Sequence, residues 1–148
     1  MDVVVVGVDG SGNAREALRA AITEASWRDC EVVAVNVVHY PAAIGFEGAS
    51  ISPETLFEAG RIALTDEVEA VTNDLPDGSL VKIQQQVRLG HIGSELLAIG
   101  DDTDTDVKLT VVGSRGLGGF RGLLVGSVTT YLVHHLNSPL LVVPANRG

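Results

Sequence analysis

The chain has 148 residues, 45% of them hydrophobic but only 4% aromatic, with a formal net charge of −9 at pH 7. This length suits a single domain spanning residues 1–148, and the acidic charge argues against general affinity for nucleic acid or anionic membranes. Cys30 is the only cysteine, which excludes an internal disulfide, and no apolar run approaches the roughly 20 residues that cross a bilayer. We therefore expect a soluble, cytoplasmic protein.

The chain begins with a predicted strand, a turn and a helix. Val3–Val8 is an almost continuous β-branched run, which is typical of a strand buried on both faces. The sequence Asp9-Gly10-Ser11-Gly12 then predicts a turn. Apolar residues at helical spacing predict a helix over Ala14–Ala25, and Asn13 with Glu16 fits a capping box at its start.

A second strand and a second helix follow. Glu31–Val38 is again apolar and β-branched, and it predicts another buried strand. Small residues and glycines without a clear period make 42–51 a mobile loop in this interpretation. Ser52 followed by Pro53 is a helix start signal, and the apolar spacing continues to about Thr72.

The rest of the chain repeats this alternation. Leu80–Val87 alternates as a strand near the sheet edge does, with Gln84 and Gln86 on one face. Strand and helix patterns then follow in turn at Ile92–Ile99, Leu109–Val112, Leu123–Leu136 and Leu140–Val143. This alternation predicts a three-layer α/β sandwich with a parallel sheet, whose ligands bind beyond the carboxyl ends of the strands.

A glycine-rich motif lies between the fourth strand and the last helix. It reads Gly113-Ser114-Arg115-Gly116, then nine residues, then Gly126-Ser127. Glycines let a ligand approach the backbone, and the first amides of a helix attract anions, so the motif predicts a phosphate cradle. The same glycines would also suit a long flexible connection.

Two familiar nucleotide motifs are excluded. No Gly-Lys-Ser or Gly-Lys-Thr follows the glycines as in a P-loop, and the spacing of a dinucleotide fingerprint is missing. Asp9 can bond a ribose hydroxyl or hold Mg²⁺ against phosphate oxygens, or it can simply order the turn. The acidic run 101–106 does not fit an EF-hand, because Val107 stands where glycine is needed.

Several segments resemble the universal stress protein family over the whole length of the chain. They are Val4–Ser11, the glycine-rich motif with Val128, and Ser138–Pro144. The resemblance implies a Rossmann-like adenine nucleotide-binding fold with a five-stranded parallel sheet in the order 3-2-1-4-5. In this family the spacing Gly-x-x-Gly, nine residues, Gly-Ser marks members that bind ATP, and the chain matches each position.

The resemblance also implies a set of nucleotide-binding residues. Gly113, Gly116, Gly126 and Ser127 would surround the triphosphate and ribose, together with Val128. Asp9, Gly10 and Ser11 would lie beside the nucleotide, and the backbone at Val37 and Val38 would meet the adenine edge. We add Arg115 for charge compensation, although a solvated loop arginine is an equal alternative. ATP is thus the expected cofactor, with Asp9 as a candidate ligand for its magnesium.

These residues predict a regulatory, stress-response module that binds ATP with little or slow turnover, because the cradle offers no evident group to activate water. The resemblance also implies a homodimer through the edge strand Leu140–Val143. Two alternatives remain open. One is a slow magnesium-dependent ATPase or nucleotidyl transferase with Asp9 as metal ligand. The other is a protein-interaction module without nucleotide, with an unidentified partner docking on residues 42–51.

Overall fold

Five parallel strands form the centre of the protein in a computed structural model that describes residues 1–39, 51–76, 80–114 and 126–145. The strands are β1 (Asp2–Gly7), β2 (Glu31–Val38), β3 (Ile83–Leu89), β4 (Asp106–Gly113) and β5 (Leu140–Val143). Their order in the sheet is β3-β2-β1-β4-β5, with every neighbouring pair parallel. The predicted sheet and its strand order are confirmed.

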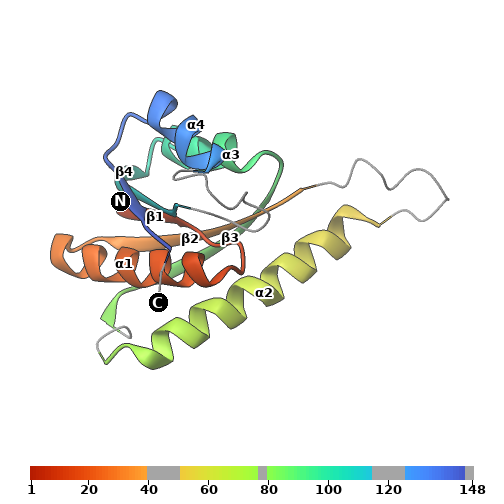
Figure 1. Ribbon diagram of the computed structural model, residues 1–148, viewed down its shortest axis with the longest axis horizontal. Coiled ribbons are helices and arrows are strands. Elements are labelled where there is room, and N and C mark those ends of the chain that lie inside the picture. Colours follow the sequence, from red (N-terminus) through yellow and green to blue (C-terminus); the bar gives the residue numbers. More distant parts are fainter. Residues whose placement is uncertain (40–50, 77–79, 115–125, 146–148) are drawn as a thin grey trace.

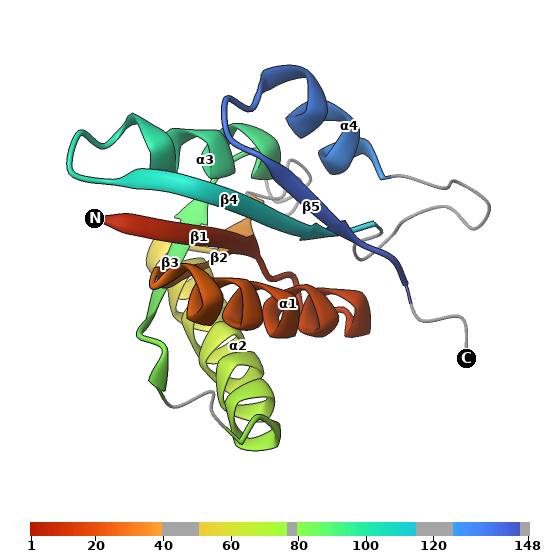
Figure 2. The same cartoon turned by 90° about the vertical axis from the view of Figure 1, so that its left-hand side faces the viewer.

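Helices cover both faces of this sheet, which gives the three layers seen in Figure 2. One face carries α1 (Gly12–Arg28) and α2 (Pro53–Asp74). The other carries α3 (Ile92–Ala98), the short 3₁₀ helix η2 (Ile99–Asp101) and α4 (Ser127–His135). The β1 side chains Val4 and Val6 pack toward α1 and α2, while Val3 and Val5 pack toward α3 and α4. Burial on both faces explains the continuous valine run.

The start of α1 differs from the prediction. Ser11 is the capping residue, and its Oγ accepts a hydrogen bond from the amide of Ala14 at 3.1 Å. The capping box expected from Asn13 and Glu16 is wrong, because the helix already begins at Gly12. The Asn13 side chain instead donates Nδ2–H to the carbonyl of Val143 at 3.0 Å, which ties α1 to β5.

β4 begins earlier than the predicted Leu109. Its pairing with β1 shifts register next to Val3 and Val4, so that Lys108 is an extra, bulged residue. Because of the bulge, Val107 packs toward α3 and α4 while Leu109 packs toward α1 and α2. Because Asp106 and Lys108 are polar, the apolar pattern in the sequence begins only after the first part of the strand.

β3 lies at the edge of the sheet, as its glutamines predicted. The strand begins and ends later than the predicted range Leu80–Val87. Leu80 is 83% exposed, and the pairing with β2 runs from Ile83 to Leu89. Ser52 caps α2 as expected, accepting from the amide of Thr55 at 3.3 Å. Residues 42–50 of the predicted loop 42–51 lie outside the described residues, as does the predicted helix start at Leu123.

α2 is the longest helix of the described chain and runs diagonally below the sheet in Figure 1. Leu64, Val68 and Val71 are its buried apolar residues, and they pack on the same core as α1. Within the described ranges, no helix combines the length and apolar character needed to cross a membrane.

Candidate functional site

The predicted site residues lie at one end of the sheet, where the parallel strands finish. Asp9, Gly10 and Ser11 follow β1, and Val37 and Val38 end β2. Gly113 ends β4, and Gly126, Ser127 and Val128 form the start of α4. We call this end the carboxyl rim. Arg115 and Gly116 lie outside the described residues.

The turn after β1 is held by its own side chains. Asp9 Oδ1 accepts a hydrogen bond from the amide of Ser11 at 3.0 Å, and Ser11 Oγ caps α1. Gly10 has φ of +85°, which favours glycine because other residues are strained there. Asp9 therefore orders the turn, which was one of the two roles considered for it. Its contact with a nucleotide stays a prediction.

Gly113 lets α1 approach the end of β4. A Cβ atom at this position would lie 2.6 Å from Asn13 Oδ1 and 2.8 Å from Asn13 Cγ, closer than real contacts allow. Its φ is outside the positive range, so the conformational freedom of glycine is not what this position requires. Glycine is required here because the Asn13 side chain, which donates to the carbonyl of Val143, lies directly against this position.

Ser114 connects three elements at the rim, and the sequence analysis did not single it out. Its amide donates to the carbonyl of Val143 at 2.8 Å, and its carbonyl accepts from the amide of Gly126 at 2.8 Å. Its Oγ accepts from the amide of Ala145 at 3.2 Å, and the residue is only 7% exposed. Ser114 therefore fixes where α4 starts relative to β4 and β5.

The start of α4 is a candidate site for an anion. Gly126 occupies the capping position and supplies no side-chain cap, and the first helical bond runs from the amide of Thr130 to its carbonyl at 3.1 Å. In the part of the chain that the structure describes, no group accepts from the amides of Ser127 or Val128. These amides and the positive end of the helix dipole both favour phosphate oxygens.

A cavity at the rim brings part of the predicted set together. Its volume is about 50 Å³, and it is lined by Gly7, Asp9, Ala14, Ile92, Val112, Gly113 and Val128. The turn after β1, the end of β4 and the start of α4 thus each contribute a predicted residue, whereas Val37 and Val38 are not in its wall. A space of this size holds only part of a nucleotide, since sites for ligands of that class measure hundreds of Å³.

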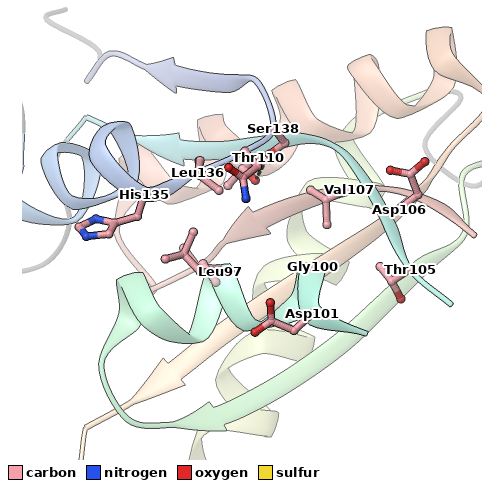
Figure 3. Close-up of a pocket in the computed structure, with 12 residues that line it drawn as sticks. Leu97, Gly100, Asp101, Thr105, Asp106, Val107, Thr110, His135, Leu136 and Ser138 are labelled. Atoms are coloured by element: carbon pink, nitrogen blue, oxygen red, sulfur yellow. Dashed lines mark hydrogen bonds between the residues drawn. The ribbon is translucent and has the colours of Figure 1, made fainter. Parts of the chain in front are cut away.

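A larger cavity of about 470 Å³ lies at the other end of the sheet, beside the first residues of β4 (Figure 3). Asp101, Asp106 and the carboxyl end of α4 at His135 contribute to its wall. Acidic side chains and the negative end of a helix dipole repel phosphate. The hydroxyls of Thr110 and Ser138 bond one another at 3.3 Å. The smaller, carboxyl-rim cavity is therefore the better candidate for binding a phosphate group.

The described residues contain no cluster of three or more His, Cys, Asp or Glu side chains that would bind a metal ion by themselves. Mg²⁺ commonly uses one or two carboxylates together with substrate phosphates, and Asp9 beside the start of α4 fits that mode. His135 belongs to an aromatic stack instead, with its ring centroid 4.2 Å from that of Tyr131.

Comparison with known proteins places the whole chain in one group. Residues 1–144 match the sequence model of the universal stress protein family. A universal stress protein of Mycolicibacterium smegmatis is 27% identical over 143 residues, which covers 95% of this chain and 47% of the relative. Universal stress protein MJ0531 of Methanocaldococcus jannaschii is 31% identical over 143 residues, covering 95% and 80% respectively. The chain thus spans about half the length of several curated relatives that it matches.

Solved structures share the fold. A universal stress protein in complex with cAMP superposes with a TM-score of 0.64 at 22% identity, covering 96% of both chains. The universal stress protein from Archaeoglobus fulgidus in complex with dAMP has a TM-score of 0.64 at 20% identity, covering 97% of both chains. At these identities the likeness establishes the α/β architecture and its strand order.

Proposed function

The chain belongs to the universal stress protein family, and we propose that it is a single ATP-binding domain with a regulatory role in the stress response. One observation carries this proposal. The N-terminus of α4 presents the amides of Ser127 and Val128 at the rim without a side-chain cap, next to Asp9 and Gly113. The proposal is further supported by the cAMP and dAMP complexes of the structural relatives.

In this proposal an adenine nucleotide would bind in a definite direction. The amides of Ser127 and Val128, with the Ser127 hydroxyl, would hold phosphate oxygens at the start of α4. Asp9 would lie toward the ribose or a phosphate-bound Mg²⁺, and the backbone at Val37 and Val38 would meet the adenine. Magnesium would neutralise phosphate charge when bound.

We propose that this site retains ATP far better than it hydrolyses it. A hydrolase needs a base positioned to take a proton from water. At the described rim the carboxylate candidate is Asp9, whose Oδ1 already accepts from the amide of Ser11. The residues thus favour binding over turnover, and ATP occupancy would be the signal that the domain carries.

Mass spectrometry of small molecules released from the freshly purified, denatured protein tests this function. We expect an adenine nucleotide at a substantial fraction of one molecule per chain. Material from an Asp9→Asn variant provides the comparison for the enzyme alternative, because a magnesium-dependent ATPase should release ADP that disappears in this variant. Release of no nucleotide, or of guanine nucleotides in equal amount, would contradict adenine-specific binding.

We also propose a homodimer formed through β5. Two hydrogen bonds show which backbone groups of β5 face β4. The amide of Thr110 donates to the carbonyl of Pro139 at 3.0 Å, and the amide of Ser114 donates to the carbonyl of Val143 at 2.8 Å. The backbone amides and carbonyls of the odd-numbered residues of β5 therefore point to β4. Those of Leu140 and Val142 point outward. Among the described residues no strand pairs with this outer edge, which supports pairing with a second copy.

A further inference from the structure

We propose that the outer edge of β3, with the groove beside α2, binds an extended polypeptide segment that carries Lys or Arg at every second position. The segment would continue the sheet by pairing with β3, a recurring mode of peptide recognition. β3 and β5 are the two opposite edge strands of the sheet, so this surface is separate from the proposed dimer interface. It does not depend on nucleotide binding.

The direction of the β3 backbone shows which groups are available. The carbonyl of Lys82 accepts from the amide of Val32 at 2.9 Å, and the amide of Gly90 donates to the carbonyl of Val38 at 3.1 Å. The register between these two bonds is continuous, so even-numbered residues of β3 pair with β2. The backbone amides and carbonyls of Ile83, Gln85, Val87 and Leu89 therefore point away from the sheet. Within the described ranges no strand pairs with them.

A groove lies directly beside this edge. It has a volume of about 450 Å³ between α2 and β3, and Phe57, Leu64 and Val87 supply its apolar wall. Phe57 remains 37% exposed, although it is a large aromatic side chain on a helix. An added strand would place every second side chain over this apolar surface, because side chains alternate between the faces of a sheet.

The charge around the groove determines the kind of segment. Glu54, Glu58 and Arg61 line it, and Arg61 is already paired with Glu58. The whole of α2 carries six acidic residues and this one arginine. A second copy of the chain would bring one acidic helix against another, which is unfavourable, whereas a basic segment would be attracted.

Lysine and arginine fit the groove better than purely apolar residues do. Their long aliphatic stems can cover Phe57 and Val87 while their charged ends reach Glu54 and Glu58. The outward backbone groups of β3 would supply binding energy that does not depend on sequence, and the acidic helix would select basic side chains.

The test uses a fluorescently labelled ten-residue peptide of alternating Lys and Val, with an alternating Glu and Val peptide for comparison. Fluorescence anisotropy should show saturable binding of the basic peptide only. Gln85→Pro should abolish it, because proline removes one outward amide while leaving the ladder to β2 intact. Gln85→Ala is the matched control, since it removes the same side chain, including its bond to Thr65, but keeps the amide.

Two charge reversals on α2 distinguish a local effect of charges in the groove from the effect of the protein's net charge. Glu54→Lys lies in the groove, whereas Glu69→Lys is an exposed α2 position outside it with the same change in net charge. Glu54→Lys should weaken binding about fivefold, and Glu69→Lys less than about twofold, as expected for local ion pairs of modest strength. An equal effect of both reversals would overturn the assignment to the groove.

Hydrogen exchange provides the decisive readout. On addition of the basic peptide, the amides of Gln85 and Val87 should gain protection, whereas those of Gln84 and Gln86, which already pair with β2, should change little. Binding that persists in Gln85→Pro, or protection without this alternation, would overturn the proposal. None of these outcomes depends on whether ATP binds.

Discussion

Gly126→Val is expected to reduce nucleotide affinity by about 100-fold or more, which corresponds to about 2.7 kcal/mol. A Cβ atom at this position would already lie 3.1 Å from the carbonyl oxygen of Ser114. The additional methyl groups of valine must then occupy space beside the start of α4, where phosphate would approach the amides of Ser127 and Val128. Calorimetric titration with Mg-ATP measures the loss.

The fold should survive this change. Gly126 has φ of −73° and ψ of 164°, values that any residue adopts, so a side chain is compatible with the local dihedral angles and the Ser114 carbonyl needs to shift only slightly. Gly100→Val is the matched control, because Gly100 lies away from the rim and its Cβ would meet only Val107 Cγ2 at 3.6 Å. It should bind Mg-ATP as the parent does. Undiminished affinity in a folded Gly126→Val protein would remove the proposed site from the start of α4.

Val142→Pro is expected to convert the proposed dimer into monomers. The amide of Val142 points outward from the edge strand β5, so proline removes a bond to the partner without removing one to β4. The side chain of Val142 packs on the core shared with α3 and α4, so some loss of stability is also expected. Light scattering coupled to size-exclusion chromatography measures the mass.

Val142→Ala separates the two effects, since it loses the same packing but keeps the amide. This variant should remain dimeric and should match the proline variant approximately in stability. Dimers in both variants would show that β5 is not the interface, and monomers in both would point to side-chain packing as the cause of dissociation.

The sequence predicted the architecture well because its signal is local. Buried parallel strands appear as runs of β-branched residues, and the helices between them carry apolar residues at helical spacing. Those two patterns, with the handedness of crossovers, were sufficient to predict a parallel sheet, whereas its strand order was implied by the family resemblance. The predicted start of α1 was wrong because Ser11 and Asn13 are both good capping residues and the sequence does not distinguish them. The predicted start of β4 was wrong because the bulge at Lys108 interrupts the apolar pattern.

The details of the site could be predicted only in part, because they depend on pairs of residues far apart in the chain. Gly113 is required by Asn13, and Ser114 holds Gly126 and Ala145. A Cβ at Gly93 in α3 would likewise lie 2.4 Å from Tyr131 Cδ1 in α4. Close packing thus explains some of these glycines and the proposed ligand site would explain others, and a single sequence cannot separate these two causes.

Titration of the purified protein with Mg-ATP and, in parallel, with Mg-GTP tests the central claim most directly. We predict saturable binding of one ATP per chain and much weaker binding of GTP, because the proposed site would meet an adenine base near Val37 and Val38. No heat with Mg-ATP at millimolar concentration, in a protein freed of bound nucleotide, would contradict the account and reduce the glycine-rich motif to a structural connection.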